Sequence, residues 1–157
     1  MAKSVKPIPD GYHSVTPYLI IGKGRASEAI DFYTRAFSAK EIMRMSGPEG
    51  GIAHAEIQIG DSKIMLADEA PKIEAYGPDH FRGSPISLLV YVPDVDATAR
   101  QATAAGATVN RPIADQFYGD RTVGLTDPFG HVWYFATHVR DVSNEEMEQH
   151  MHASATA

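Results

Sequence analysis

The residues best suited to acid–base chemistry are a histidine and a glutamate two positions apart, His54 and Glu56, in the stretch IAHAEIQIG. On an extended strand such residues project to the same side, with Cα atoms about 7 Å apart. A desolvated glutamate beside an apolar residue such as Met65 would have a raised pKa and could act as a general base. The alternative is that Glu56 pairs with an arginine and stabilises the wall of a site.

The stretch YGDR is the second candidate, because Asp120 and Arg121 closely follow Phe117 and Tyr118. A guanidinium with aromatic neighbours suits a planar or anionic ligand, and it could hold an oxyanion. The alternative is a structural pair of Asp120 with Arg121 that locks the loop.

Metal binding has less support from the residue types. His54 and Glu56 would need a third ligand such as His13. His150 and His152 could also bind a metal; the alternative is that they belong to a frayed polar tail. The chain has no cysteine, which excludes disulfides, thiolate ligands and a cysteine nucleophile.

Charge and hydropathy limit the partners. The formal net charge of −6 argues against nucleic acid and against anionic membrane surfaces, both of which favour clustered lysine and arginine. No apolar run is long enough to span a bilayer, and the first residues contain no apolar core of a signal peptide. We therefore expect a cytoplasmic protein with no membrane partner.

The elements that must position these residues occur twice along the 157 residues. Each half reads strand, helix, strand, strand, strand. Ser87 follows Thr16 by 71 residues and Tyr134 follows Met65 by 69, so equivalent points keep nearly one offset. Such a repeat predicts two sheets, each covered on one face by a helix. The expected parts are an N-terminal arm at 1–11, a first module at 12–68, a linker at 69–85, a second module at 86–140, and a C-terminal helix and tail at 141–157.

Local signals mark where the helices begin. Ser27 could cap the first helix, expected at 26–37. Asp94 or Asp96 lies near the start of the second. Ser143 is followed three residues later by Glu146, a capping box that predicts a short C-terminal helix.

Alternation along the hairpin at 52–68 separates two faces. The apolar set expected beneath the helix is Ala53, Ala55, Ile57 and Ile59. The set expected on the opposite face is His54, Glu56, Gln58 and Met65. If Gly60 and Asp61 form a two-residue turn, Glu56 pairs with Met65 across the hairpin. The alternative is that this face is merely solvated. In the second half most residues around Tyr134 are apolar, so alternation alone does not show which of them lie beneath the helix and which lie on the opposite face.

Several stretches together resemble the vicinal oxygen chelate superfamily, which includes glyoxalase I, bleomycin-resistance proteins and extradiol dioxygenases. They are PYLII, ASEAIDFYTRAF, HAEIQIGDSKIMLADE, VYVPDVDA and QFYGDRTVGLTDPFGHVWYFATH. Within it the chain is most similar to the PhnB-like group. The resemblance implies an α+β fold of two βαβββ modules forming cupped, barrel-like mixed sheets with helices on the outside. It also implies a homodimer.

The resemblance also locates the metal ligands of the superfamily's metalloenzymes, which are His, Glu or Gln on the first and fourth strands of each module. The matching positions here are Thr16, Met65, Ser87 and Tyr134. None of these is a good ligand for a divalent transition metal. We therefore expect no metal and no cofactor.

These observations predict a protein that binds a small, partly apolar or aromatic molecule in the cupped cavity without a metal, as in the antibiotic-resistance branch. The expected ligand-binding residues are Thr16, Gln58, Met65, Ser87, Leu89, Tyr91, Phe117, Tyr118, Asp120 and Tyr134. The alternative is a lyase or isomerase of the superfamily in which Glu56 is the base, His54 its neighbour, and Arg121 the holder of an oxyanion.

Overall fold

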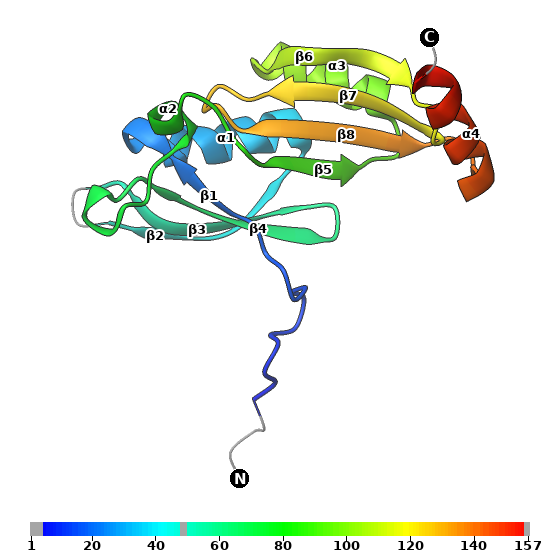
Figure 1. Cartoon of the computed structure of the whole chain (residues 1–157). Helices are drawn as coiled ribbons and strands as arrows, with labels where there is room; N and C mark the ends of the chain where they lie inside the picture. The colour runs from blue at the N-terminus through cyan, green and yellow to red at the C-terminus, as the bar shows by residue number, and fades with distance from the viewer. Residues whose placement is uncertain (1–4, 48–49, 156–157) are drawn as a thin grey trace. The chain divides into compact units, whose positions relative to one another are not determined.

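The computed structural model describes residues 5–47 and 50–155. The chain divides into two compact units, Met1–Gly83 and Ser84–Ala157. Each builds a four-stranded mixed sheet, in the order β1-β4-β3-β2 in the first unit and β5-β8-β7-β6 in the second (Figure 1). In both sheets the first strand pairs in parallel with the fourth, and the other pairs are antiparallel. The predicted repeat of βαβββ modules is therefore confirmed; each sheet is open rather than closed into a barrel.

The elements of the first unit are β1 (Tyr18–Ile21), the 3-10 turn η1 (Gly22–Gly24), α1 (Ala26–Phe37), β2 (Lys40–Ser46), β3 (Ile52–Ile59), β4 (Ser62–Asp68), the 3-10 turn η2 (Pro71–Ile73) and α2 (Pro78–Phe81). Those of the second unit are β5 (Ser87–Tyr91), α3 (Val95–Ala105), β6 (Thr108–Asp115), β7 (Asp120–Thr126), β8 (Val132–His138) and α4 (Asn144–Ala155). No helix within the described residues is long and apolar enough to cross a membrane.

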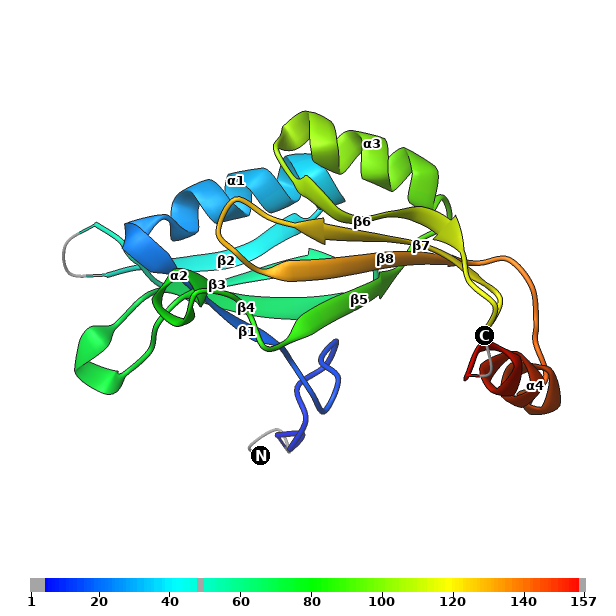
Figure 2. The same ribbon diagram turned by 45° about the horizontal axis from the view of Figure 1, so that its top comes forward.

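Helix α1 covers one face of the first sheet and provides much of that unit's core (Figure 2). Its buried residues recur at helical spacing, as the sequence predicted, and they are Ala26, Ala29, Ile30, Phe32, Tyr33, Ala36 and Phe37. They are apolar or aromatic, so their removal from water stabilises the packing of helix on sheet. In the described part of this unit the other helix, α2, is four residues long and contacts η1.

The start of α1 is capped from a distant strand, and the prediction that Ser27 caps it is wrong. The backbone N–H of Ala26 donates to Oδ1 of Asp68 at 2.8 Å, and Oδ2 of Asp68 accepts from the N–H of Ile52 at 2.7 Å. One β4 carboxylate thus joins the helix to β3. Ser27 lies inside the first turn, where its hydroxyl accepts from Arg44 at 3.2 Å.

The alternation predicted for β3 is confirmed at three of its four apolar positions. Ala55, Ile57 and Ile59 are buried, whereas Ala53 is exposed. The register with β2 explains the exception. Met45 pairs with His54, but the next residue, Ser46, pairs with Ile52, so Ala53 is passed over and Ile52 is buried instead. The two-residue turn at Gly60 and Asp61 is as predicted, with Ile59 paired to Ser62.

In the second unit α3 lies over one face of the sheet (Figure 2). Asp94 is its cap, accepting from the N–H of Ala97 at 2.9 Å, so Asp94 rather than Asp96 has the capping role. Trp133 and Phe135 of β8 are fully buried, while Tyr134 is only partly buried. Trp133 and Phe135 therefore face α3 and Tyr134 faces the other side of the sheet, a choice that the sequence pattern left open.

The turn between β7 and β8 is organised by one buried carboxylate, Asp127. Its Oδ1 accepts from the N–H groups of Phe129 and His131 at 2.9 and 3.0 Å, and its Oδ2 accepts from the indole of Trp133 at 2.9 Å. Gly130 has φ of 90°, a conformation that glycine adopts without strain. The turn therefore also anchors Trp133, the largest fully buried side chain of the described residues.

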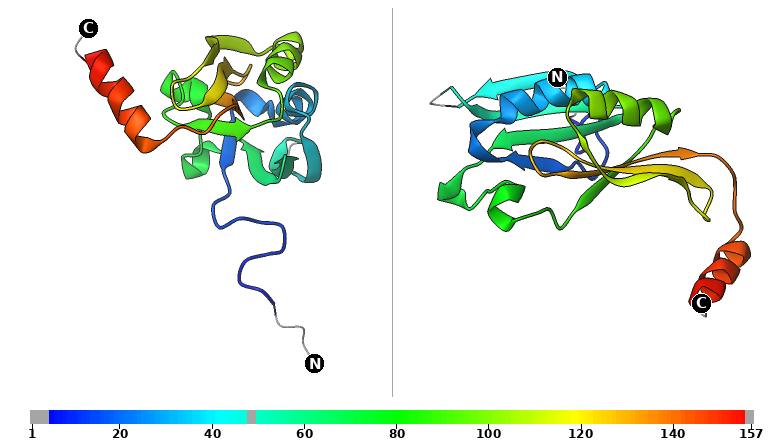
Figure 3. Two further views of the ribbon diagram at one scale, coloured as in Figure 1. Left: turned by 90° about the vertical axis from the view of Figure 1, so that its right-hand side faces the viewer. Right: turned by 90° about the horizontal axis from the view of Figure 1, so that it is seen from above.

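Helix α4 begins with the predicted capping box. The hydroxyl of Ser143 accepts from the N–H of Glu146 at 3.2 Å, and the carboxylate of Glu146 accepts from the N–H of Ser143 at 3.1 Å. The helix continues to Ala155, further than the short segment expected. Both views in Figure 3 place it beyond the end of β8, away from α3.

Replacement of Asp127 by alanine should lower the free energy of unfolding by about 2 to 4 kcal/mol, because three donors lose a buried charged acceptor. Trp133 is the only tryptophan, so its fluorescence during urea unfolding reports this site directly. Asp61→Ala, in an exposed turn, is the matched control and should change stability by less than about 0.5 kcal/mol. Equal effects of the two substitutions would contradict the role of Asp127.

Candidate functional site

The face of the first sheet opposite α1 carries a row of four side chains, one from each strand. Tyr18 pairs with Met65, Met65 with Glu56, and Glu56 with Met43. Directly paired residues project to the same face of a sheet, so these four lie side by side. The predicted pairing of Glu56 with Met65 is confirmed.

Glu56 is the centre of a hydrogen-bond network on this face. Glu56 is only 5% exposed, and both of its carboxylate oxygens have hydrogen-bond partners. The hydroxyl of Tyr12 donates to Oε2, and Nε2 of His54 lies 3.3 Å from Oε1. Nδ1 of His54 lies 2.8 Å from the hydroxyl of Tyr18. The network therefore links the segment before β1, β1 itself and β3.

These contacts decide the charge of Glu56. The hydrogen bond from Tyr12 lowers the pKa of Glu56 and outweighs burial, which raises it; His54 and Lys63 lower it further. The expected rise in pKa is therefore wrong, because the sequence did not show the tyrosine that solvates the carboxylate. An ionised carboxylate with a lowered pKa is a good hydrogen-bond acceptor and a weak proton acceptor. In return, Glu56 raises the pKa of the Tyr12 phenol.

Apolar side chains surround this buried charge. Tyr18 is 47% exposed, Met43 38% and Met45 54%. Met45 pairs with His54 and so shares its face. We call the set Tyr18, Met43, Met45, His54, Glu56 and Met65 the first open face.

Two predicted ligand-binding residues lie at the margins of this set. Gln58 donates its side-chain amide to the carbonyl of Gly60 at 3.0 Å, which directs it along the hairpin turn. Thr16 precedes β1 and is partly exposed. Neither takes part in the Glu56 network.

The second sheet has an equivalent row opposite α3. Leu89 pairs with Tyr134, Tyr134 with Gly124, and Gly124 with Arg111. A Cβ added to Gly124 would approach Oδ1 of Asn110 to 2.3 Å and Cε1 of Tyr134 to 3.0 Å, so a larger residue here would displace its neighbours. The Arg111 guanidinium carbon lies 5.6 Å from the centre of that ring. Leu89 is exposed, as is Ser87 at the start of β5.

A second buried carboxylate, Asp120, lies at the start of β7. It is 4% exposed, accepts from the hydroxyl of Tyr91 at 2.8 Å, and lies 2.7 Å from Nδ1 of His138. Nε2 of His138 is 3.1 Å from Asp141. The two carboxylates raise the pKa of His138, with Asp120 the stronger cause. Tyr91 and Asp120, both predicted site residues, are thus joined to a histidine that the sequence analysis did not select.

Arg121 points away from this cluster. Its Nε and Nη2 donate to Asp96 at 2.7 and 3.0 Å, and its Nη1 donates to Asp115 at 2.9 Å. Asp96 belongs to α3, so Arg121 lies on the helix-covered side of β7. The predicted alternative of an Asp120–Arg121 pair does not form. The structure places Arg121 in two ion pairs that an oxyanion would have to replace.

The remaining aromatic candidates lie in the connection between β6 and β7. The rings of Phe117 and Tyr118 meet edge to face, with centroids 5.3 Å apart. Phe117 also stacks on His150 of α4, with centroids 4.4 Å apart and planes 3° from parallel. These two predicted residues belong to the second unit, whereas the Glu56 network belongs to the first.

The residues at the superfamily's metal-ligand positions do not fit a metal ion. Met65 and Tyr134 occupy equivalent places in the two rows and offer a thioether and a phenol, while Thr16 and Ser87 offer hydroxyls. Divalent transition metals prefer imidazole, carboxylate or thiolate. Across residues 5–47 and 50–155, no group of three or more His, Asp or Glu side chains is arranged to hold an ion. Both ring nitrogens of His54 already face partners.

Some site residues could have been found from the sequence and others could not. Tyr18 is two positions from Thr16, and His138 is four positions from Tyr134, so strand alternation assigns each to the face of its neighbour. Tyr12 lies 44 residues before Glu56, outside any strand, and no spacing indicates their contact.

Comparison with known proteins gives the family. The sequence model of the Glyoxalase/Bleomycin resistance protein/Dioxygenase superfamily matches residues 16–135. The chain therefore belongs to this superfamily. An uncharacterised protein of Mycobacterium bovis is 37% identical over 154 residues, which are 96% of each chain.

Solved structures show the same fold. A gene product of Arabidopsis thaliana aligns with a TM-score of 0.65 at 24% identity, over 80% of this chain and 98% of that one. A PhnB protein from Bacillus cereus aligns at 0.60 and 20% identity, over 80% and 99%. TnmS3, an antibiotic binding protein from Streptomyces, aligns at 0.59 and 19% identity, over 80% and 97%. The predicted resemblance to the superfamily, and to a PhnB-like protein in it, is confirmed.

Removal of the Tyr12 hydroxyl should raise the pKa of Glu56, because the strongest cause of its lowering is lost while burial remains. A carbon-13 NMR titration of the glutamate carboxyls in Tyr12→Phe measures this change. Tyr18→Phe is the matched control; its hydroxyl contacts His54, not Glu56, so its effect should be smaller. An unchanged Glu56 titration in Tyr12→Phe would remove the basis for an ionised anchor.

The raised pKa of His138 makes stability depend on pH in a definite direction. Its contribution is complete below the unfolded-state pKa of about 6.5 and is lost as the pH rises through the higher folded-state value. His138→Gln should therefore destabilise the chain more at pH 6 than at pH 9, measured by urea unfolding followed through Trp133. Asp141→Asn should retain most of the pH dependence, since Asp120 is the stronger partner. A loss that is equal at both pH values would contradict this coupling.

Proposed function

We propose that this protein binds a small, partly apolar or aromatic molecule on its first open face without a metal ion. The observation that carries the proposal is the arrangement of exposed Tyr18, Met43 and Met45 around the buried, ionised Glu56. An apolar rim with one fixed charge would orient a ligand through a single polar group while its body contacts the methionines.

The chemistry of the rim defines the ligand further. Methionine side chains are flexible and polarisable, so they adapt to apolar or aromatic groups of irregular shape. Each Glu56 oxygen has one protein partner and can accept a second hydrogen bond. The proposed ligand therefore has an apolar or aromatic body and an N–H or O–H donor that reaches Glu56.

Metal independence is supported by the donor set, because hydroxyl, thioether and phenol groups stand where the family's metalloenzymes have imidazole or carboxylate. A fold neighbour that is an antibiotic binding protein, TnmS3, is consistent with a binding role for such a fold. The proposal for this chain rests on its own side chains.

The alternative of a lyase or isomerase has less support. A base that removes a proton at neutral pH works best with a raised pKa, and the pKa of Glu56 is lowered. The proposed holder of the oxyanion, Arg121, is paired with Asp96 and Asp115 on the helix-covered side of β7. Both features favour binding over turnover.

The test is a thermal-shift screen of apolar and aromatic compounds that carry a donor group, run in EDTA, followed by calorimetric titration of the best compound. Glu56→Gln should weaken binding about tenfold or more, since a hydrogen bond to a charged group is lost. Met45→Ser should weaken it about fivefold through lost apolar contact. Met151→Ser, an exposed methionine of α4, is the matched control and should have no effect.

Binding that disappears in EDTA would contradict metal independence. Equal affinities for wild type and both open-face variants would place the ligand elsewhere. Conversion of the compound by wild type, abolished in a folded Glu56→Gln variant, would establish the enzyme alternative instead.

A further inference from the structure

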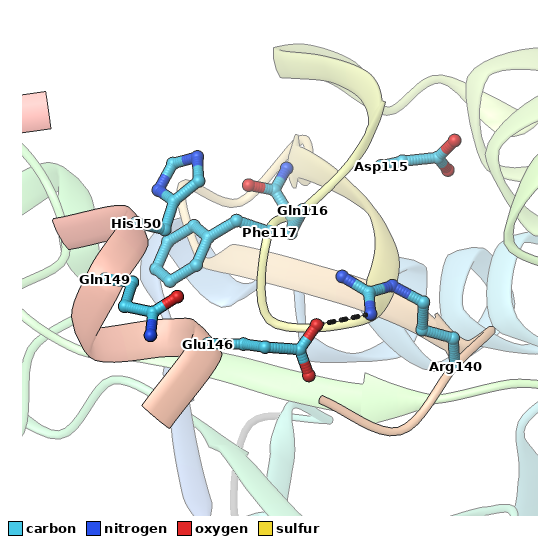
Figure 4. Close-up of a pocket in the computed structure, with 7 residues that line it drawn as sticks. All are labelled: Asp115, Gln116, Phe117, Arg140, Glu146, Gln149 and His150. Atoms are coloured by element: carbon cyan, nitrogen blue, oxygen red, sulfur yellow. Dashed lines mark hydrogen bonds and ion pairs between the residues drawn. The ribbon is translucent and has the colours of Figure 1, made fainter. Parts of the chain in front are cut away.

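The second unit contains a cavity of about 620 Å³ where α4 faces the connection between β6 and β7 (Figure 4). Three segments line it: the connection itself, the residue Arg140 after β8, and one side of α4. The volume lies in the range of small-molecule sites in proteins, about 300 to 1,000 Å³. The binding function proposed above concerns the first unit and does not use this cavity.

An aromatic platform forms one wall. The phenyl ring of Phe117 is covered by the imidazole of His150, with centroids 4.4 Å apart and planes within 3° of parallel. Figure 4 shows the imidazole of His150 next to the ring of Phe117. The chain thus places a planar, nitrogen-containing ring of its own on this face of Phe117, which shows that the platform accepts such a ring.

Polar groups form the rest of the lining. Arg140 lies 3.3 Å from Glu146, so its charge is balanced within the cavity, and Glu146 is also held by Ser143. Asp115 is paired with Arg121 outside the lining set. Gln149 extends toward the cavity from α4 beside Glu146 (Figure 4). Both carboxylates of the lining are therefore paired with arginines, and the preference for a cationic over an anionic guest comes from the ring face of Phe117.

We propose that this cavity binds a planar heteroaromatic molecule of neutral or positive charge, with its ring on Phe117 in the position that the His150 imidazole occupies. Stacking on the phenyl face favours a flat ring, and the negative face of that ring favours positive charge. His150 is then an internal competitor, which the ligand displaces from Phe117. Gln149 and the cavity carboxylates accept hydrogen bonds from the ring nitrogens.

The probe is proflavine, a planar cationic heteroaromatic dye, titrated against the full-length protein by fluorescence anisotropy. Phe117→Leu should weaken binding about tenfold, because base–aromatic stacking contributes about 1 to 3 kcal/mol. Phe117→Tyr keeps the ring and should bind within about twofold of wild type. His150→Ala removes the competitor and should bind several-fold more tightly. Circular dichroism establishes that each variant is folded.

Two controls locate the dye. Asp61→Ala, in the exposed turn between β3 and β4, should leave the affinity unchanged, and 2-naphthalenesulfonate, a planar anion, should bind at least tenfold more weakly. Absence of saturable binding, or equal binding by Phe117→Leu and wild type, overturns the proposal. Weaker binding by His150→Ala overturns the competitor role, and weaker binding by Asp61→Ala assigns the dye to a site outside the cavity and overturns the proposal for the cavity.

Discussion

In the part of the chain that the structure describes, each sheet is covered by one helix, α1 or α3, on one face. Strand alternation determines which side chains point toward that helix and which point away from it. Residues that point toward α1 or α3 form the cores, as Ile57 and Trp133 do. Their neighbours in sequence must point the other way, and there they meet residues from all four strands in register. A row such as Tyr18, Met65, Glu56 and Met43 is the direct consequence. The candidate site is therefore a product of the same periodicity that builds the core.

The open faces tolerate buried charge because each carboxylate is solvated by side chains. Glu56 has Tyr12 and His54, and Asp120 has Tyr91 and His138. A buried carboxylate without such partners would be protonated or would destabilise the fold. Throughout the described part of the chain, every buried side-chain nitrogen or oxygen has a hydrogen-bond partner. In both units a tyrosine and a histidine contact the buried carboxylate. The two carboxylates are not at equivalent positions of the repeat, because the residue equivalent to Glu56 in the second unit is Gly124.

The same rows contain Met65 and Tyr134, two of the residues that the resemblance relates to the superfamily's metal ligands. Met65 is partly buried and lies between Tyr18 and Glu56 on the first open face. At the equivalent position a tyrosine ring lies beside Gly124 and beneath Arg111. A thioether and a phenol are poor ligands for a divalent transition metal. The chain thus has the superfamily's fold with these two groups at equivalent places in its two sheets.

The sequence by itself determined the repeat, the succession of strands and helix along each module, the helix at 26–37, the hairpin register and the pairing of Glu56 with Met65. These depend on spacing within a few dozen residues, where periodicity and turn chemistry are sufficient. The predicted homodimer and cytoplasmic location stay predictions. Only the tertiary structure decided that Asp68 caps α1, that Tyr12 solvates Glu56 and lowers its pKa, and that Arg121 pairs with Asp96 rather than Asp120. Each of these contacts joins segments that are distant in sequence, or depends on which face of the sheet a side chain lies on. Local sequence patterns do not specify which polar group from a distant segment will be the partner.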